Sequence, residues 1–391
     1  MGDAFIVGAV RTAVGRKNGK LSKVHPIDLG ALVLDELVAR TGIDPAAVDD
    51  VVFGCVDQVG AQSANIARNC ILSTTSFPES VPGTTVDRQC GSSQQALHFA
   101  AQAVMSGVHD VVIAGGVEVM SLVPLGGNAI AGYKAGMGGP YGEGMKRRYP
   151  GVRFNQFTGA EMIAEKWGFS REVLDRFGLT SHEKAARATR EGRFAREIVP
   201  VEVTLEDGSS EKFATDEGFR ENASYEAMAA LKTLSDKGLL TAGTSSQISD
   251  GAAAVLVASQ AGLDKLRATP RARIAAMTLA GDDPVMMLTA PIPATQKLLA
   301  RAGVSIDQVD RYEVNEAFAS IPLAWLRDIG ADPAKLNVNG GAIALGHPLG
   351  CTGAKLMTTL LHELERVQGR YGIQTMCEGG GLANATLIER L

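Results

Sequence analysis

Four side chains suited to covalent chemistry or proton transfer stand in separate segments of this sequence: Cys90, Asn315, His347 and Cys377. Cys90 ends the segment Thr-Val-Asp-Arg-Gln-Cys and precedes Gly-Ser-Ser, where we expect a strand to pass into a helix. Free amides at a helix start can receive a developing oxyanion, and the positive end of the helix dipole favours a thiolate. The segment predicts a nucleophile; a small buried cysteine in a tight turn is the structural alternative.

The segment Gly346-His347-Pro-Leu-Gly places one histidine among glycines that let other atoms approach closely. We interpret His347 as a proton-transfer residue, and the alternative is a structural histidine that satisfies loop carbonyls. The remaining histidines are predicted to have no catalytic role: His25, His98, His109, His182 and His362.

Cys377 ends a predicted buried strand and is followed by Glu378 and three glycines. Glycines in that place are typical of an oxyanion site or of a close approach by a ligand. Asn315 stands where another predicted strand ends and a helix is expected to begin. It can hold a water molecule, or it can simply cap the helix.

An internal repeat organises the elements that carry these residues. Residues 39–54 and 300–315 align without gaps at an offset of 261, with five identities in sixteen positions. The same offset pairs Cys90 with Cys351, and each precedes an apolar pattern with helical spacing and then a predicted strand. Helix 91–105 with strand 110–116, and a later helix with strand 372–377, therefore belong to a duplicated unit.

The alternation of helices with apolar strands predicts an α/β fold with mainly parallel sheets, in which helices lie between and outside two sheets. Residues 118–250 have no counterpart in the second half, so we expect an inserted loop domain that acts as a lid or binding platform. The predicted divisions are 1–117 with 251–269 as the N-terminal core, 118–250 as the insertion, and 270–391 as the C-terminal core. Helices are predicted at 158–167 and 170–193.

Composition excludes several classes of protein. The chain has 391 residues, 45% hydrophobic and 21% charged, as expected for a folded globular chain. A net charge of -5 argues against a broad nucleic-acid surface but leaves room for a local basic pocket. There is no apolar run of about 18 residues for a membrane span. Without a targeting signal we expect a cytoplasmic protein, and five cysteines without a C-x-x-C pair predict reduced thiols and no metal site.

Taken in order, the Cys90 segment, Asn315-Glu-Ala-Phe, Gly346-His347-Pro-Leu-Gly and Cys377-Glu-Gly-Gly-Gly resemble the thiolase family over nearly the full length. The stretch at 241–253 resembles the thiolase segment that returns from the loop domain to the core. The resemblance implies duplicated α/β units in a five-layer αβαβα arrangement. It also implies a coenzyme A-dependent acyltransferase that works through a Cys-His-Cys-Asn site.

The resemblance assigns a role to each residue. His347 would deprotonate Cys90, which attacks the 3-keto carbon of a 3-oxoacyl-CoA and retains the acyl group. His347 and a water held by Asn315 would stabilise the departing acetyl-CoA enolate, and Cys377 would supply its proton. Cys377 would then activate the incoming CoA thiol, while the amides of Cys90 and Gly379 hold the thioester oxygen.

CoA is a substrate in this scheme, and no permanently bound cofactor or metal is expected. The family match places Ser246 near the pantetheine arm and Arg220 near the nucleotide phosphates. The expected partners are CoA thioesters and further copies of the chain, in a homodimer or homotetramer.

Departures from the family pattern concern the substrate. Biosynthetic acetoacetyl-CoA thiolases usually carry a histidine and a methionine in the covering loop, where this chain has Arg153-Phe-Asn-Gln-Phe. Two features look more like degradative thiolases, including those of steroid breakdown: Ser92-Ser93-Gln94-Gln95 after Cys90-Gly91, and Glu378 after Cys377. Two alternatives keep the thiolase family: a biosynthetic thiolase, and a catalytically silent CoA- or lipid-binding relative. A decarboxylating ketoacyl synthase would need a second histidine. An unrelated cysteine hydrolase would leave Cys377 and Asn315 unexplained.

Overall fold

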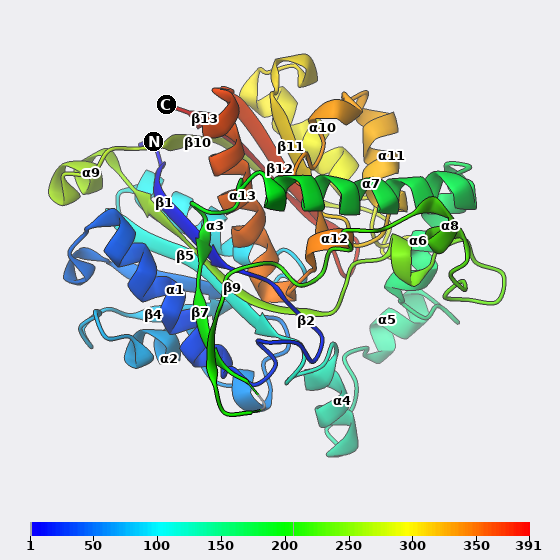
Figure 1. Cartoon of the computed structure of the whole chain (residues 1–391), viewed down its shortest axis with the longest axis horizontal. Coiled ribbons are helices and arrows are strands. Elements are labelled where there is room, and N and C mark those ends of the chain that lie inside the picture. The colour runs from blue at the N-terminus through cyan, green and yellow to red at the C-terminus, as the bar shows by residue number, and fades with distance from the viewer. Residues whose placement is uncertain (1, 206) are drawn as a thin grey trace.

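The computed structural model describes residues 2–205 and 207–391 and places a mixed, 11-stranded sheet through the molecule (Figure 1). The main path runs β11-β12-β13-β10-β1-β9-β5-β3-β4, with β2 beside β9 and β6 beside β1. These strands are β1 (Phe5–Thr12), β2 (Gly15–Arg16), β3 (Asp50–Gly54), β4 (Gly83–Val86), β5 (Val111–Val119), β6 (Ile198–Val199), β9 (Ser249–Ala258), β10 (Ala272–Gly281), β11 (Arg311–Val314), β12 (Tyr371–Glu378) and β13 (Leu382–Arg390).

The two halves of the sheet repeat one another. The order β3-β5-β9-β1 in the first half corresponds to β11-β12-β13-β10 in the second, and β1 meets β10 at Phe5↔Arg273 and Ile6↔Ala272. The aligned segments 39–54 and 300–315 both fold as a helix end, a short 3-10 turn and a strand. The duplication predicted from the offset of 261 is therefore present in the fold.

The prediction of mainly parallel sheets is wrong. Only β3–β4, β3–β5, β11–β12 and β1–β6 are parallel among the strand pairs of the described residues. The strand β13 returns from β12 through a turn of three residues, which is too short for a parallel crossover. Burial on both faces makes β9 continuously apolar from Ala252 to Ala258, the pattern that also marks parallel strands.

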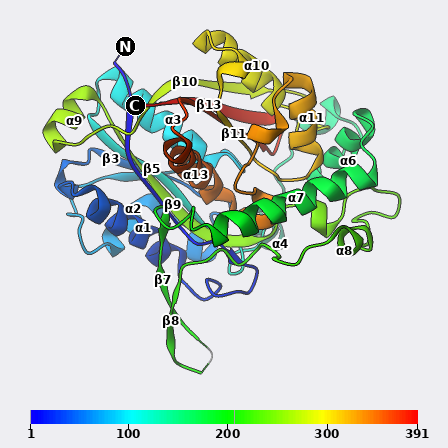
Figure 2. The ribbon, with the colours of Figure 1, turned by 45° about the horizontal axis from the view of Figure 1, so that its top comes forward.

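Helices form three layers around the two half-sheets, as the five-layer arrangement requires (Figures 1 and 2). The helices α3 and α13 lie in the middle and share one buried core with both halves, including Leu97, Val112, Leu360 and Ile388. The helices α1 and α2 cover the outer face of the first half, and α10 and α11 cover that of the second. Their bounds are α1 (Pro26–Thr41), α2 (Ile66–Ser73), α3 (Ser92–Ser106), α9 (Gln260–Leu266), α10 (Pro291–Ala302), α11 (Ser320–Ile329), α12 (Ala342–Leu345) and α13 (Thr352–Val367).

The chain between β5 and β9 forms the part that has no repeat. It contains α4 (Gly127–Lys134), α5 (Glu143–Arg148), α6 (Gln156–Lys166), α7 (Arg171–Arg190), α8 (Tyr225–Ala229) and the projecting hairpin β7 (Val201–Thr204) and β8 (Ser210–Phe213) (Figure 2). The helices predicted at 158–167 and 170–193 are α6 and α7. The side chain of Ser170 caps α7 by accepting a hydrogen bond from the amide of Val173. None of the helices in the described residues combines the length and apolarity needed to cross a bilayer.

Candidate active site

Cys90 lies in a tight turn between β4 and α3. Gln89 has a positive φ of 50°, a left-handed conformation that is unfavourable for a residue with a side chain. The turn is held because Ser92 Oγ accepts a hydrogen bond from the amide of Arg88 and donates one to the carbonyl of Gln89. Cys90 therefore has a fixed place directly before the helix, as the sequence predicts.

The charge state of Cys90 differs from the prediction. Burial raises the pKa of Cys90 to about 12, and the nearby carboxyl of Glu378 contributes further. A Cβ atom on Gly91 would lie only 1.9 Å from Glu378 Oε1, so this carboxyl presses against the residue next to Cys90. Desolvation outweighs the helix dipole here, so the resting group is a thiol, and a charged Glu378 adds to this effect at higher pH.

The contribution of Glu378 can be measured directly. Burial raises the pKa of Glu378 to about 8, so the carboxyl becomes charged above that pH and then opposes a Cys90 thiolate. In Glu378→Gln we expect alkylation of Cys90 by iodoacetamide to be about tenfold faster at pH 9 and nearly unchanged at pH 6. If Glu378→Gln and the wild type are alkylated at equal rates at pH 9 as well as at pH 6, Glu378 does not act on Cys90.

The orientation of His347 is set by Thr352, at the start of α13. Thr352 Oγ1 donates its hydrogen to the carbonyl of Pro348 at 2.7 Å, and it lies 2.6 Å from His347 Nδ1. The ring tautomer follows from both neighbours of the imidazole. With the hydroxyl hydrogen on Pro348, Nδ1 donates to Thr352, and Asn315 Nδ2, which can only donate, lies 3.4 Å from Nε2. The lone pair of the imidazole is therefore on Nε2. Burial lowers the pKa of His347 to about 3, with help from the positive charge of Lys355, so the ring is neutral.

The backbone before His347 admits only glycine. Gly346 has φ 90° and ψ 164°, and a Cβ atom there would lie 2.3 Å from Ser249 Oγ. The same serine accepts a hydrogen bond from the amide of His347 at 3.3 Å. The return segment that contains Ser249 thus fixes the histidine loop.

Asn315 faces His347. Its Nδ2 lies 3.4 Å from His347 Nε2, and its buried Oδ1 has no hydrogen-bond partner in the described residues. The capping alternative is excluded because α11 begins only at Ser320, after Ala319. A buried amide oxygen without a partner is suited to accept a hydrogen bond from a water molecule.

Cys377 lies near the end of β12 and is fully buried. Burial raises the pKa of Cys377 well above the usual value. The residues that follow Cys377 contact the Cys90 turn, because a Cβ atom on Gly91 would lie 1.9 Å from Glu378 Oε1 and one on Gly379 would lie 3.0 Å from Gln89 Oε1. Cys90 itself packs with Leu349 and Met376, which lie beside His347 and Cys377 in sequence. In residues 2–205 and 207–391 neither the amide of Cys90 nor that of Gly379 donates a hydrogen bond to a protein group. Asn315 and His347 therefore lie within 3.4 Å of each other, and the segments that carry Cys90 and Cys377 are in contact.

Glu118 is a residue that the sequence reasoning missed. It is fully buried, and its Oε2 accepts hydrogen bonds at 2.9 Å from the amides of Val56 and Gly350. Gly350 belongs to the His347 loop and Val56 to the first half, so one carboxylate ties the two halves together behind the site. A single acid within the apolar strand β5 was the available signal, because an acid is seldom buried without partners.

A cavity of about 500 Å³ opens between α7, α8 and the return segment. Arg220 lines this cavity, and its amide donates to Nδ1 of His182, which lines it too. Ser246 does not line it directly but lies between Gly243 and Gln247, which do. The amide of Ser246 donates to the carbonyl of Ala317, two residues after Asn315. Arg220 therefore lies at the cavity, and Ser246 lies in the segment that joins the cavity wall to the loop after Asn315.

Comparison with known proteins gives consistent results along the whole chain. A model described as the thiolase N-terminal domain matches residues 4–261, and one described as the thiolase C-terminal domain matches residues 268–390. The chain is 55% identical to steroid 3-ketoacyl-CoA thiolase FadA6 of Mycobacterium tuberculosis, over 100% of this chain and 95% of the relative. It is 43% identical to the 3-ketoacyl-CoA thiolase of Idiomarina loihiensis over the full length of both.

Solved structures agree with these sequence matches. The acetyl-CoA acetyltransferase of Bacillus anthracis superposes with a TM-score of 0.91 at 36% identity, over 100% of this chain and 99% of that one. The human mitochondrial 3-ketoacyl-CoA thiolase superposes with a TM-score of 0.90 at 32% identity and the same coverage.

Proposed function

Because the chain belongs to the thiolase family, it is a CoA-dependent acyltransferase, and we propose that it cleaves 3-oxoacyl-CoA thioesters derived from steroids. The substrate class is supported by the higher identity to the steroid 3-ketoacyl-CoA thiolase, 55%, than to the general 3-ketoacyl-CoA thiolase of Idiomarina loihiensis, 43%. The observation that supports the mechanism is the environment of His347: its Nδ1 lies 2.6 Å from Thr352 Oγ1 and its Nε2 lies 3.4 Å from Asn315 Nδ2, which leaves Nε2 as the proton acceptor.

In the first half-reaction, Cys90 sulfur attacks the 3-keto carbon while its proton passes to His347 Nε2. A thiol with a pKa of about 12 and an imidazole with a pKa of about 3 do not exchange a proton at rest, so the transfer accompanies the attack. The bond between C2 and C3 breaks, and its electrons form the acetyl-CoA enolate. His347 Nε2–H and a water held by Asn315 Oδ1 stabilise the enolate oxygen, and Cys377 donates the proton to C2.

In the second half-reaction, the thiolate of Cys377 takes the proton of an incoming CoA thiol. The CoA sulfur attacks the thioester carbonyl, whose oxygen is held by the free amides of Cys90 and Gly379. Cys90 leaves as a thiolate and recovers its proton from His347. The products are acetyl-CoA and an acyl-CoA shortened by two carbons, and every group returns to its starting state.

The cavity lined by Arg220 is the proposed entrance for CoA, since a guanidinium is suited to the nucleotide phosphates. Ser246 would meet the pantetheine arm on the way to Cys90. CoA enters as a substrate and not as a bound cofactor. We further propose that the chain forms a homodimer or homotetramer and that it lies in the cytoplasm. Residues 118–250 form the inserted domain between the two core domains. The five free cysteines fit a reducing compartment.

The proposed function is tested with CoA and three classes of 3-oxoacyl-CoA: acetoacetyl-CoA, a long straight-chain substrate and a steroid-derived one. We expect the highest kcat/KM for the steroid-derived substrate. In the absence of free CoA, peptide mass spectrometry should locate the acyl group on Cys90. A preference for acetoacetyl-CoA formation from acetyl-CoA would favour the biosynthetic alternative, and no turnover of any substrate would favour a silent relative.

The role of Thr352 gives a separate test. In Thr352→Val the hydroxyl that fixes His347 is lost with little change in shape, so the ring can rotate or change its tautomer. We expect kcat to fall about 100-fold with KM nearly unchanged, because misplacing a catalytic group has effects of that size. Thr352→Ser keeps the hydroxyl and should recover most of the activity. Equal losses in both variants would point to a packing role instead.

A further inference from the structure

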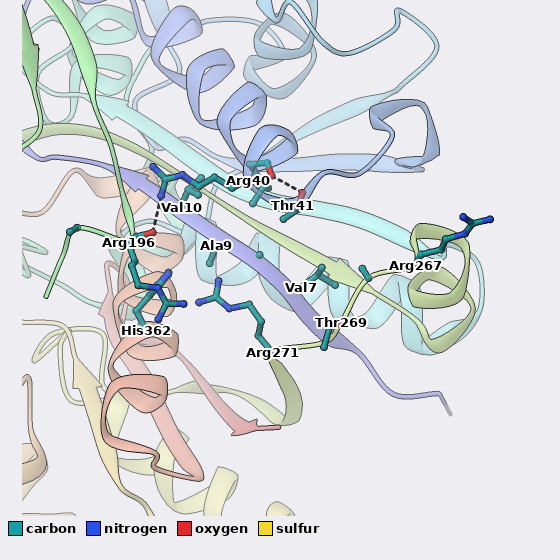
Figure 3. A pocket seen from close by; sticks show the side chains of 14 residues that line it. Val7, Ala9, Val10, Arg40, Thr41, Arg196, Arg267, Thr269, Arg271 and His362 are labelled. Atoms are coloured by element: carbon teal, nitrogen blue, oxygen red, sulfur yellow. Dashed lines mark hydrogen bonds between the residues drawn. The ribbon is translucent and has the colours of Figure 1, made fainter.

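A second cavity, of about 640 Å³, lies at the far end of α13 from His347 (Figure 3). Its charged and titratable lining groups are Arg40, Arg196, Arg267, Arg271 and His362. No aspartate or glutamate is among the lining residues that the structure describes. His362 follows Thr352 by ten residues on α13, which corresponds to about 15 Å along the helix axis. The cavity is therefore distinct from the active site. Its lining is cationic, and Glu36 and Glu365 behind the arginines balance part of that charge.

The arginines are held in place by partners that leave part of each guanidinium free. Arg271 donates from Nε and one terminal nitrogen to Glu365, at 2.7 and 2.9 Å, and Arg196 donates to the same carboxylate at 3.0 Å. Arg40 donates from Nε to Glu36 at 2.7 Å and from its terminal nitrogens to the carbonyls of Arg196 and Ile198, each at 2.8 Å. A guanidinium has five N–H groups, so these contacts orient the arginines without using all their donors. Figure 3 shows Arg196, Arg271 and His362 gathered beside Ala9.

The floor of the cavity is a stretch of β1 that pairs with β9 along one edge and has no strand partner along the other edge in the described residues. This strand pairs with β10 at Phe5 and Ile6 and with β6 at Arg11 and Thr12, and residues 7–10 between them line the cavity. The amide of Arg11 donates to the carbonyl of Glu197 on this side. Because strand amides alternate in direction, the amide of Ala9 points to the same side and adds a neutral donor.

His362 contributes a different kind of group. Its Nδ1 lies 2.8 Å from the carbonyl of Thr358, which can only accept, so Nδ1 carries the proton and Nε2 is left as an acceptor. Burial lowers the pKa of His362, which keeps the ring neutral. An acceptor beside several cations suits a ligand that carries hydroxyl groups as well as phosphates.

We propose that this cavity binds a nucleotide with two or more phosphate groups. Forked N–H donors from arginines match phosphate oxygens, and the volume lies in the range of small-molecule sites. Two sources share this chemistry: a free nucleoside diphosphate and the nucleotide end of a second CoA molecule. The site is independent of the thiolase reaction because none of its residues lies among Cys90, Asn315, His347 and Cys377.

The test is isothermal titration calorimetry of the intact protein with ADP, with CoA and with inorganic pyrophosphate. We expect ADP to bind, and to bind about tenfold more weakly to Arg196→Gln, which removes one cation but leaves the Arg271–Glu365 pair. Arg176→Gln is the matched control, since Arg176 is exposed and paired with Glu172 elsewhere on the surface. Thiolase turnover without ADP should be the same in both variants.

The titrations also identify the source of the ligand. If the free nucleotide is the source, ADP binds and CoA shows a single site that Arg196→Gln does not change. If CoA is the source, it shows two sites, and Arg196→Gln weakens one of them. Two results would overturn the proposal. One is that neither ADP nor pyrophosphate binds at millimolar concentration, and the other is that Arg196→Gln binds ADP as tightly as Arg176→Gln and the wild type do. Arg40→Gln, which removes a second cation and leaves the Arg271–Glu365 pair intact, checks that result with a second residue.

Discussion

Cys90→Ala is expected to lose thiolytic turnover by about 10⁴-fold or more, the range seen when a covalent nucleophile is removed. No other sulfur can take over, because Cys377 occupies the proton-donor position and the side chains of Cys55, Cys70 and Cys351 are at most 1% exposed. The measurements are the rate of CoA-dependent loss of 3-oxoacyl-CoA and the mass of the protein after incubation with substrate alone. We expect no acyl adduct in the variant.

The repeat supplies a matched control. Cys351 is the counterpart of Cys90 in the second half, and it is buried in the layer between the half-sheets. Cys351→Ala removes the same atom from an equally buried position, so we expect turnover within a few-fold of wild type. An adduct that persists in Cys90→Ala, or an equal loss in Cys351→Ala, would contradict the assignment of the nucleophile.

The candidate site was largely predictable because each of its four residues lies at the end of a strand or in a glycine-rich loop. Such positions combine a reactive side chain with small neighbours, and that combination is visible in a sequence. The acidity of Cys90 was not predictable. It depends on burial and on the approach of Glu378 from β12, nearly 300 residues later, and no local pattern reports such a contact.

Other features could not be predicted from the sequence because they too depend on contacts that no local pattern reports. Thr352 looks like an ordinary first residue of a helix, and its role appears only when its hydroxyl is seen between Pro348 and His347. The direction of β9 and β13 depends on which strands they join, not on their own apolar residues. The cation-lined cavity draws Arg40, Arg196 and Arg271 from three distant segments, which no spacing rule connects.

Cys90 and Cys377 lie in contacting segments but have different chemical roles. Cys90 has to become a nucleophile as its proton leaves, whereas Cys377 has to give up a proton and take one back. Both thiols are protonated at rest because burial raises both pKa values. A protonated thiol is a poor nucleophile but a suitable proton donor. Single substitutions at Cys90 and at Cys377 should therefore affect the two half-reactions differently.

Cys377→Ala is accordingly expected to lose turnover by about 10²- to 10⁴-fold, the usual contribution of a positioned acid or base. Cys90 and His347 are unchanged in this variant, so a slow acyl transfer to Cys90 should persist. Removal of the base for the CoA thiol should make the acyl-enzyme accumulate. Rapid quench with mass analysis of the intact protein measures that species directly, with and without CoA.

Cys70→Ala is the control for this variant, because Cys70 is equally buried but packs against α1 in the other core, away from the site. It should turn over normally and show no excess of acyl-enzyme. If Cys377→Ala instead forms no acyl-enzyme at all, Cys377 is needed for the attack itself, and the division of labour between the two cysteines is wrong. If turnover is unchanged, the proton is carried by another group, and water bound at Asn315 Oδ1 is the group that the structure would next implicate.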